Sequence, residues 1–241
     1  MDELSPRQIQ ILKAVVDEYI NTADPVGSDV LEKKYSIGVS PATIRNEMVA
    51  LTQKGFLRQP HTSAGRIPTP RALKLYVKQL MDEKKLSVAE EVAAKEQVLQ
   101  SRDNIDNLMH QVTRSLAQQT HSLAVAATDQ GDVWHAGYAN ILDIPEFYNI
   151  DVTSRVLALI EESRRLQELL FDHAEWGDSV EIVFGEELGW PNFESVGIVA
   201  CQCTTPTGKT TLGVIGPARF NYPAVIPIVR YYSNLVSEHI R

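Results

Sequence analysis

The chain has few of the features that mark secreted, membrane or metal-binding proteins. Its 241 residues include only two cysteines, and its N-terminus has no signal-like segment, so we expect a cytoplasmic protein. No apolar run approaches the roughly 20 residues of a membrane-spanning helix, which argues against a membrane role. The composition, 44% hydrophobic and 22% charged, argues against disorder and allows two modest domains.

Motifs for catalysis, metals and cofactors are also missing. Cys201 and Cys203 would share one face of a strand as a redox or metal pair, or as the thiols of an enzyme. No second Cys pair or His-x-x-His lies near them, and small residues alternating on a buried strand explain them better. The turn Gly185–Glu187 could bind a metal, but a solvated loop is the simpler interpretation. We therefore expect a protein that is not an enzyme, with no cofactor and no metal.

Positive charge is concentrated in the N-terminal third of the chain. The whole chain has a formal net charge of -8, but residues 1–85 carry 13 Lys/Arg against 10 Asp/Glu, leaving 10 against 21 for residues 86–241. From Ser40 to Leu80, seven basic residues accompany a single acid, Glu47. A local basic footprint is what phosphate binding requires, so this part is predicted to bind DNA. The alternative is a small helical domain whose basic face is only solvated.

The clearest helix signals lie between residues 36 and 69. Ser40 can cap the first N–H groups, Pro41 suits the first helical position and Gly55 can end the helix. Ile44, Met48 and Leu51 recur at helical spacing and are expected to face a core. The positions that face outward or sideways are Ala42, Thr43, Arg45, Asn46, Val49 and Gln53. Small, uncharged or basic residues of this kind can enter a DNA major groove.

The elements around this helix follow a recognisable order. A capping box at Ser5–Gln8 begins a first helix, and a second runs from about Ser28 to Tyr35. After Gly55, two short strands enclose a polar tip at residues 61–66, and a further helix is expected from Arg71 to about Glu83. Helix, helix, turn, helix and hairpin is the order of a winged helix-turn-helix domain, expected over residues 1–85.

The rest of the chain predicts one long helix and a mixed domain. Residues 86–118 contain neither Gly nor Pro, and their apolar stripe predicts a continuous helix about 50 Å long, within a linker assigned to residues 86–120. That stripe could pack on its own domain or pair with a second subunit. Strands are predicted at 122–128, 133–138, 180–184, 196–203 and 210–215, and helices at 152–172 and 224–240. We expect an α+β domain with an antiparallel sheet over residues 121–241.

Two adjoining motifs resemble a known family. Residues 39–48 (VSPATIRNEM) and 59–69 (QPHTSAGRIPT) resemble the DNA-binding signature of the bacterial heat-inducible transcription repressors, the HrcA family. A looser similarity to the GAF-like domain of these repressors covers Gly137–Leu142, Pro145–Phe147, Gly185–Glu187 and Leu212–Tyr222. Together the two regions cover most of the chain.

The resemblance implies a repressor of chaperone and heat-shock operons. Such a protein binds an inverted-repeat operator in double-stranded DNA as a homodimer, and the chaperonin GroEL assists its folding, so unfolded protein that titrates the chaperonin derepresses the genes. The expected DNA-binding residues are Ser40, Ala42, Thr43, Arg45, Asn46, Gln53, His61, Ser63 and Arg66. His61 could instead only order its own loop, and Arg66 could only brace the hairpin.

One departure from the family pattern concerns the dimer. The family usually has a long segment, including an inserted dimerisation domain, between the first strand of the GAF-like domain and the Gly-Tyr-Ala-Asn region, and here only a short stretch separates the two. The interface is therefore expected at the 86–118 helix or at the GAF-like sheet. A second interpretation is a metabolite-sensing transcription regulator with a ligand pocket in the GAF-like domain, although fold analogy is its main support.

Overall fold

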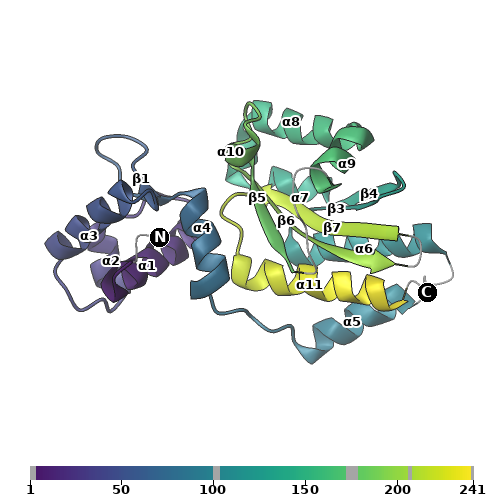
Figure 1. Ribbon diagram of the computed structural model, residues 1–241, viewed down its shortest axis with the longest axis horizontal. Helices are drawn as coiled ribbons and strands as arrows, with labels where there is room; N and C mark the ends of the chain where they lie inside the picture. The colour runs from purple at the N-terminus through teal and green to yellow at the C-terminus, as the bar shows by residue number, and fades with distance from the viewer. Residues whose placement is uncertain (1–3, 100–103, 172–178, 206–207, 240–241) are drawn as a thin grey trace. The chain divides into compact units, whose positions relative to one another are not determined.

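The computed structural model describes residues 4–99, 104–171, 179–205 and 208–239. The chain divides into two compact units, which we call unit 1 (Met1–Asp82) and unit 2 (Glu83–Arg241) (Figure 1). Each unit has its own apolar core, so each is described by itself.

Unit 1 has the element order that the sequence predicts. Its elements are α1 (Pro6–Thr22), α2 (Ser28–Lys34), α3 (Pro41–Gln53), β1 (Leu57–Arg58), β2 (Ile67–Pro68), α4 (Pro70–Leu75) and the π-helical turn η1 (Tyr76–Leu80). The Ser5–Gln8 capping box begins α1, and the Ser40 side chain caps α3. Strands β1 and β2 pair antiparallel as a short hairpin. The last helix ends at Leu80, three residues earlier than expected.

The core of unit 1 lies between α1, α2, α3 and the base of the hairpin. The predicted inner stripe of α3 is confirmed, because Ile44, Met48 and Leu51 are all buried. They pack with Leu12 of α1 and Leu31 of α2. Full burial of a side chain of this size stabilises a fold by about 1.5–3 kcal/mol, so this small core fixes how α3 is held.

Unit 2 is built on a five-stranded antiparallel sheet. Its strands are β3 (Leu123–Thr128), β4 (Val133–Ala136), β5 (Glu181–Phe184), β6 (Val196–Thr205) and β7 (Gly208–Pro217), in the order β4-β3-β7-β6-β5. Its helices are α5 (Val88–Leu99), α6 (Ile105–Thr120), α7 (Tyr138–Leu142), the short 3-10 helix η2 (Pro145–Tyr148), α8 (Ile150–Glu161), α9 (Ser163–Phe171), α10 (Gly185–Leu188) and α11 (Tyr222–His239). The predicted mixture of helices with an antiparallel sheet is confirmed.

Helices cover both faces of this sheet (Figure 1). Helices α8 and α9 pack on the face that carries Leu123, Ile198 and Ile215. Successive strand residues point to opposite sides of a sheet, and helices α6 and α11 cover the side chains on the opposite face. All six residues of β3 are buried as a result.

Two helices expected to be continuous are each divided. The single helix across residues 86–120 is wrong, because Asn104 has an extended backbone (φ -140°, ψ 115°) and begins α6 as its N-cap. Helices α5 and α6 pack on each other and on α11 inside unit 2. The helix expected over 152–172 is also wrong, since Glu162 (φ -88°, ψ 77°) separates α8 from α9. In both cases a polar residue that leaves the helical conformation divides an apolar stripe.

Candidate nucleic-acid interface

Helix α3 presents one continuous exposed face. Ala42, Arg45, Asn46, Val49 and Gln53 are all exposed, and their spacing of three or four residues places them on the side opposite the buried stripe. Thr43 lies at the margin of this face and is half-buried. The outward orientation predicted for these residues is confirmed, and the face offers donors, an amide and small apolar groups to whatever approaches it.

Two of the expected site residues also build the start of α3. The Ser40 hydroxyl oxygen accepts a hydrogen bond from the Thr43 N–H at 3.3 Å, and the two hydroxyl oxygens are 3.1 Å apart. An N-cap of this type stabilises a helix by about 1 kcal/mol. Ser40 and Thr43 therefore fix where the exposed face begins.

The hairpin tip after β1 is closed by its own side chains. The Gln59 amide donates hydrogen bonds to the carbonyl oxygens of Thr62 and Ala64, both at 2.9 Å. The Ser63 hydroxyl lies 3.3 Å from His61 Nδ1, and both residues are exposed. His61 thus contributes to ordering its own loop while its ring stays accessible.

The base of the hairpin is fixed to both α3 and the segment before α2. Arg66 and Val26 exchange two backbone hydrogen bonds of 2.9 Å, and Arg66 Nε donates to Thr52 Oγ1 of α3 at 3.2 Å. Gly65 permits this approach, because a Cβ at that position would lie 2.4 Å from the Val26 carbonyl oxygen. The hairpin is therefore held in one place relative to the exposed face of α3.

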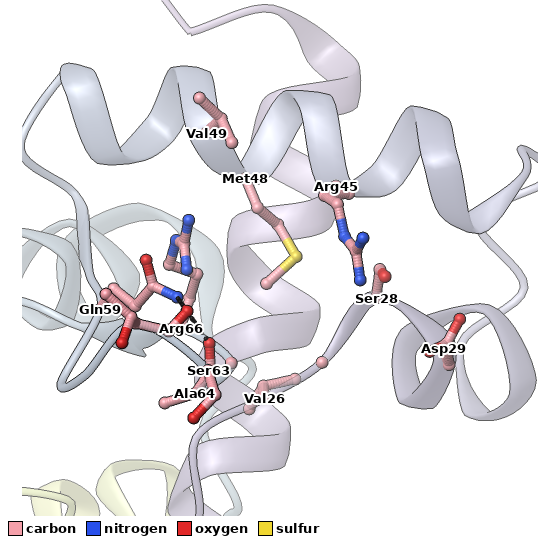
Figure 2. A pocket seen from close by; sticks show the side chains of 13 residues that line it. Val26, Ser28, Asp29, Arg45, Met48, Val49, Gln59, Ser63, Ala64 and Arg66 are labelled. Atoms are coloured by element: carbon pink, nitrogen blue, oxygen red, sulfur yellow. Dashed lines mark hydrogen bonds between the residues drawn. The ribbon is translucent and has the colours of Figure 1, made fainter.

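A groove of about 440 Å³ lies between α3, the start of α2 and the hairpin; we call it the unit 1 groove (Figure 2). Its lining residues are Val26, Gly27, Ser28, Asp29, Arg45, Met48, Val49, Gln59, Thr62, Ser63, Ala64, Gly65 and Arg66. Figure 2 shows Arg45 and Met48 extending from α3 toward the segment before α2. The groove is the place where α3 and the hairpin can contact one ligand together.

The groove brings together only some of the residues expected from the sequence. Arg45, Ser63 and Arg66 line it, whereas the other six, Ser40, Ala42, Thr43, Asn46, Gln53 and His61, lie outside its lining. Sequence reasoning missed Gln59 and Thr62, although both lie within the motif at residues 59–69. It also missed Val26 to Asp29, for which no local signal existed, because only the bridge to Arg66 brings that segment to the groove.

Helix α2 is anchored to α1 by a buried carboxylate. Glu18 accepts hydrogen bonds from Lys34 Nζ at 2.5 Å and from the Tyr35 hydroxyl at 3.1 Å. Burial, and then the neighbouring Glu18, raise the pKa of Tyr35 to about 12, so the hydroxyl remains a neutral donor near pH 7. This contact keeps α2, and with it one wall of the groove, in place.

Unit 2 has a small concavity among its described residues. This concavity, lined by Arg155, Leu159, Arg165, Trp190, Pro191 and Phe193, has a volume of about 50 Å³, far below the roughly 300 Å³ at which ligand pockets usually begin. Cys201 and Cys203 are buried on β6, and neither takes part in a disulfide. Glu187 accepts a hydrogen bond from the Phe184 N–H at 3.2 Å, which gives that acidic turn a structural role.

The part of the chain that the structure describes has neither a cluster of metal-binding side chains nor a helix that could span a membrane. Within residues 4–99, 104–171, 179–205 and 208–239, no three His, Cys, Asp or Glu side chains are grouped so that they could hold a metal ion. Over the same part of the chain, every helix is too short or too polar to cross a membrane.

Comparison with a solved structure first shows that this fold occurs in another protein. The chain superposes on the crystal structure of a hypothetical protein with a TM-score of 0.76, at 17% identity and over 99% of both chains. The two proteins therefore share one fold of a helical unit joined to a unit with an antiparallel sheet.

Sequence comparison then gives the family. The family model "HrcA protein C terminal domain" matches residues 48–226. The heat-inducible transcription repressor HrcA of Syntrophobacter fumaroxidans is 26% identical over 99% of this chain and 98% of its own length. The repressor of the same name from Kineococcus radiotolerans is 36% identical over 69% of this chain and 46% of its own length. The chain belongs to the HrcA family, as the two N-terminal motifs predict.

The same alignments show that this chain is a short member. The alignment with the Syntrophobacter protein spans 342 positions, whereas this chain has 241 residues. A large part of the relative therefore has no counterpart here. In unit 2 the chain turns directly from β3 into β4 through residues 129–132, and Asp129 accepts a hydrogen bond from the Lys209 N–H at 3.0 Å.

Proposed function

We propose that this protein is a sequence-specific transcriptional repressor of heat-shock and chaperone operons. The observation that carries the proposal is the exposed face of α3, which lies beside a hairpin-bordered groove in the basic part of the chain. The names of its HrcA relatives, which are heat-inducible transcription repressors, support the same function.

In this proposal unit 1 is a winged helix-turn-helix domain and α3 is its recognition helix. Arg45 and Asn46 meet base edges in the major groove, where arginine pairs with guanine and asparagine with adenine. Ala42, Thr43 and Gln53 lie beside them, and Ser40 fixes the start of the helix. In the hairpin, His61, Ser63 and Arg66 contact phosphates or the adjacent minor groove, which fixes orientation and carries little sequence information.

The proposed operator is an inverted repeat and the active protein a homodimer. Two recognition helices related by a two-fold axis reach half-sites about 34 Å apart, or a multiple of that spacing. Unit 2 is the GAF-like regulatory domain, and it is the part whose assisted folding by the chaperonin GroEL couples repression to the load of unfolded protein. A dimer contact through the sheet of unit 2, or through its helices α5 and α6, takes the place of the inserted segment.

A gel-shift assay with a chaperone-operon promoter tests the proposal. The protein is expected to bind the promoter more tightly than a random duplex of equal length, and chaperonin is expected to increase the fraction of binding-competent protein. Asn46→Ala, which removes one exposed amide without touching the core, is expected to lose part of the preference for the promoter. Equal binding to promoter and random duplex, in protein with a normal circular-dichroism spectrum, would refute sequence-specific repression.

A further inference from the structure

The exposed face of α3 contains one large apolar side chain. Val49 is 39% exposed and lies one turn beyond Arg45, between Asn46 and Gln53 on the same face. A β-branched residue is not favoured in a helix for its propensity, and Val49 lies outside the core of unit 1. Neither helix formation nor core packing therefore explains valine at this position.

Two residues near Val49 in the sequence, Glu47 and Thr52, form hydrogen bonds within unit 1. Thr52 donates to the Met48 carbonyl at 2.8 Å and accepts from Arg66, while Glu47 accepts from Gln8 at 3.1 Å. Val49 instead lines the unit 1 groove, next to Met48 on α3 (Figure 2). A ligand that contacts the exposed face and the hairpin together will therefore meet an aliphatic surface at Val49.

The chemistry of a base edge indicates what that surface fits. In the major groove, guanine, adenine and cytosine offer hydrogen-bonding groups, whereas thymine also presents an apolar 5-methyl group. Arg45 and Asn46 supply donors for the hydrogen-bonding groups, and an aliphatic side chain suits only the 5-methyl group of thymine. We propose that Val49 reads the 5-methyl group of a thymine in each operator half-site and is thus a specificity-determining residue. This inference rests on the proposed function.

Exposed aliphatic residues are common on protein surfaces, so the test needs a matched residue that is exposed but lies away from the groove. Ile9 of α1 is 37% exposed and is not part of the groove lining, so Ile9→Ala removes a similar apolar group elsewhere in unit 1. Val49→Ala is expected to fold, because the site is exposed and alanine is the better helix former. Val49→Thr, which keeps the shape but replaces a methyl by a hydroxyl, is the second variant.

The experiment combines these variants with methyl deletion in the DNA. A duplex is selected from a random library with the wild-type protein, and each thymine in turn is replaced by deoxyuridine, which lacks only the methyl group. At one position per half-site, this replacement is expected to weaken wild-type binding roughly fourfold. Val49→Ala should lose a similar factor on the unmodified duplex and then be insensitive to deoxyuridine at that position. Val49→Thr should lose part of that factor, and Ile9→Ala should behave as wild type.

The outcomes separate this inference from the function on which it rests. Suppose that the library yields a specific duplex, but that at every position deoxyuridine affects wild type and Val49→Ala equally. Val49 then does not read a methyl group, and the repressor function stands. If no sequence is enriched by well-folded protein, sequence-specific binding itself is refuted, and the role of Val49 is refuted with it.

Discussion

Helices α3 and α6 use their surfaces in opposite ways. Of the 13 residues of α3, three are buried, whereas seven of the 16 residues of α6 are buried. Helix α3 is held by a narrow apolar stripe and keeps most of its side chains accessible, while α6 is a structural layer under the sheet of unit 2. A helix can thus be firmly placed by very few contacts when its caps and neighbours fix it, and the rest of its surface is then available for binding.

The largest expected effect is a lower free energy of unfolding with no change in the affinity for DNA. Leu116 of α6 is fully buried, so Leu116→Ala should lower the free energy of unfolding by about 2–5 kcal/mol. Urea denaturation measures this loss. Folded Leu116→Ala protein should bind operator with unchanged affinity, and a change of less than 1 kcal/mol in stability would show that α6 is not the structural helix described here.

The converse is expected on α3. Arg45→Ala and Asn46→Ala should each weaken operator binding by about 1–3 kcal/mol, with smaller losses on random DNA, because base contacts carry sequence information. Their unfolding free energies should stay close to wild type, since both side chains are exposed. Fluorescence anisotropy on both DNAs gives the comparison, and equal losses on the two would contradict direct readout.

The hairpin base provides a test of how rigidly the groove is built. A methyl group at Gly65 would meet the Val26 backbone, so Gly65→Ala should destabilise unit 1 by about 1–3 kcal/mol and open the Val26–Arg66 bridge. Gly27→Ala is the control, because nothing lies within 4 Å of a Cβ there and its φ is -93°. Amide hydrogen exchange at Val26 and Arg66 should rise in the first variant alone.

Arg66 should give a smaller effect that depends on salt. If its guanidinium neutralises one phosphate, Arg66→Ala reduces the magnitude of the slope of log affinity against log salt by about 0.9. Arg164→Ala is the control, since this exposed arginine of α9 in unit 2 pairs only with nearby Glu168 among the described contacts. A slope unchanged from wild type would mean that Arg66 only braces the hairpin through Thr52.

The smallest expected effect is a pH dependence within unit 2. Arg230 donates two hydrogen bonds to the Glu83 carboxylate, at 2.7 and 2.9 Å, and lowers the pKa of Glu83 below its usual value of 4.5. Because the pKa is lower in the folded state, the ion pair stabilises the fold fully at pH values above the usual pKa. This stabilisation is lost as the pH falls through the lowered, folded-state pKa. Wild type should therefore be slightly more stable than Glu83→Gln at pH 7, by less than about 1 kcal/mol because the pair is partly exposed. The difference should close in urea titrations below pH 4.5, and a constant difference would rule out this ion pair as its source.

Local signals explain most of what the sequence predicted correctly. Ser40, Pro41 and Gly55 determine the ends of α3, and these act within one or two helical turns. The inner and outer faces of α3 follow from periodicity alone. The polar, glycine-containing tip at residues 61–66 between two short strands located the hairpin.

Non-local contacts explain what the sequence did not predict. The segment from Val26 to Asp29 joins the groove only because Arg66, forty residues later in the chain, pairs with Val26. Helices α5 and α6 both pack on α11, a contact that the apolar stripe at residues 86–118 does not reveal. Gln59 was missed because its amide acts on backbone carbonyls rather than on a partner that a pattern could name.

The pairing of β3 with β7 has a consequence for the order in which the protein forms. The apolar core of unit 1 is built from residues within the first 82 of the chain, so this core can form early in synthesis. Strand β3, buried at all six positions, must wait for β7, which begins 80 residues after β3 ends. Pairing across such a separation is slow, and an apolar strand without its partner is prone to aggregate. During synthesis the chain thus passes through a stage in which unit 1 is folded while the sheet of unit 2 is incomplete and prone to aggregate.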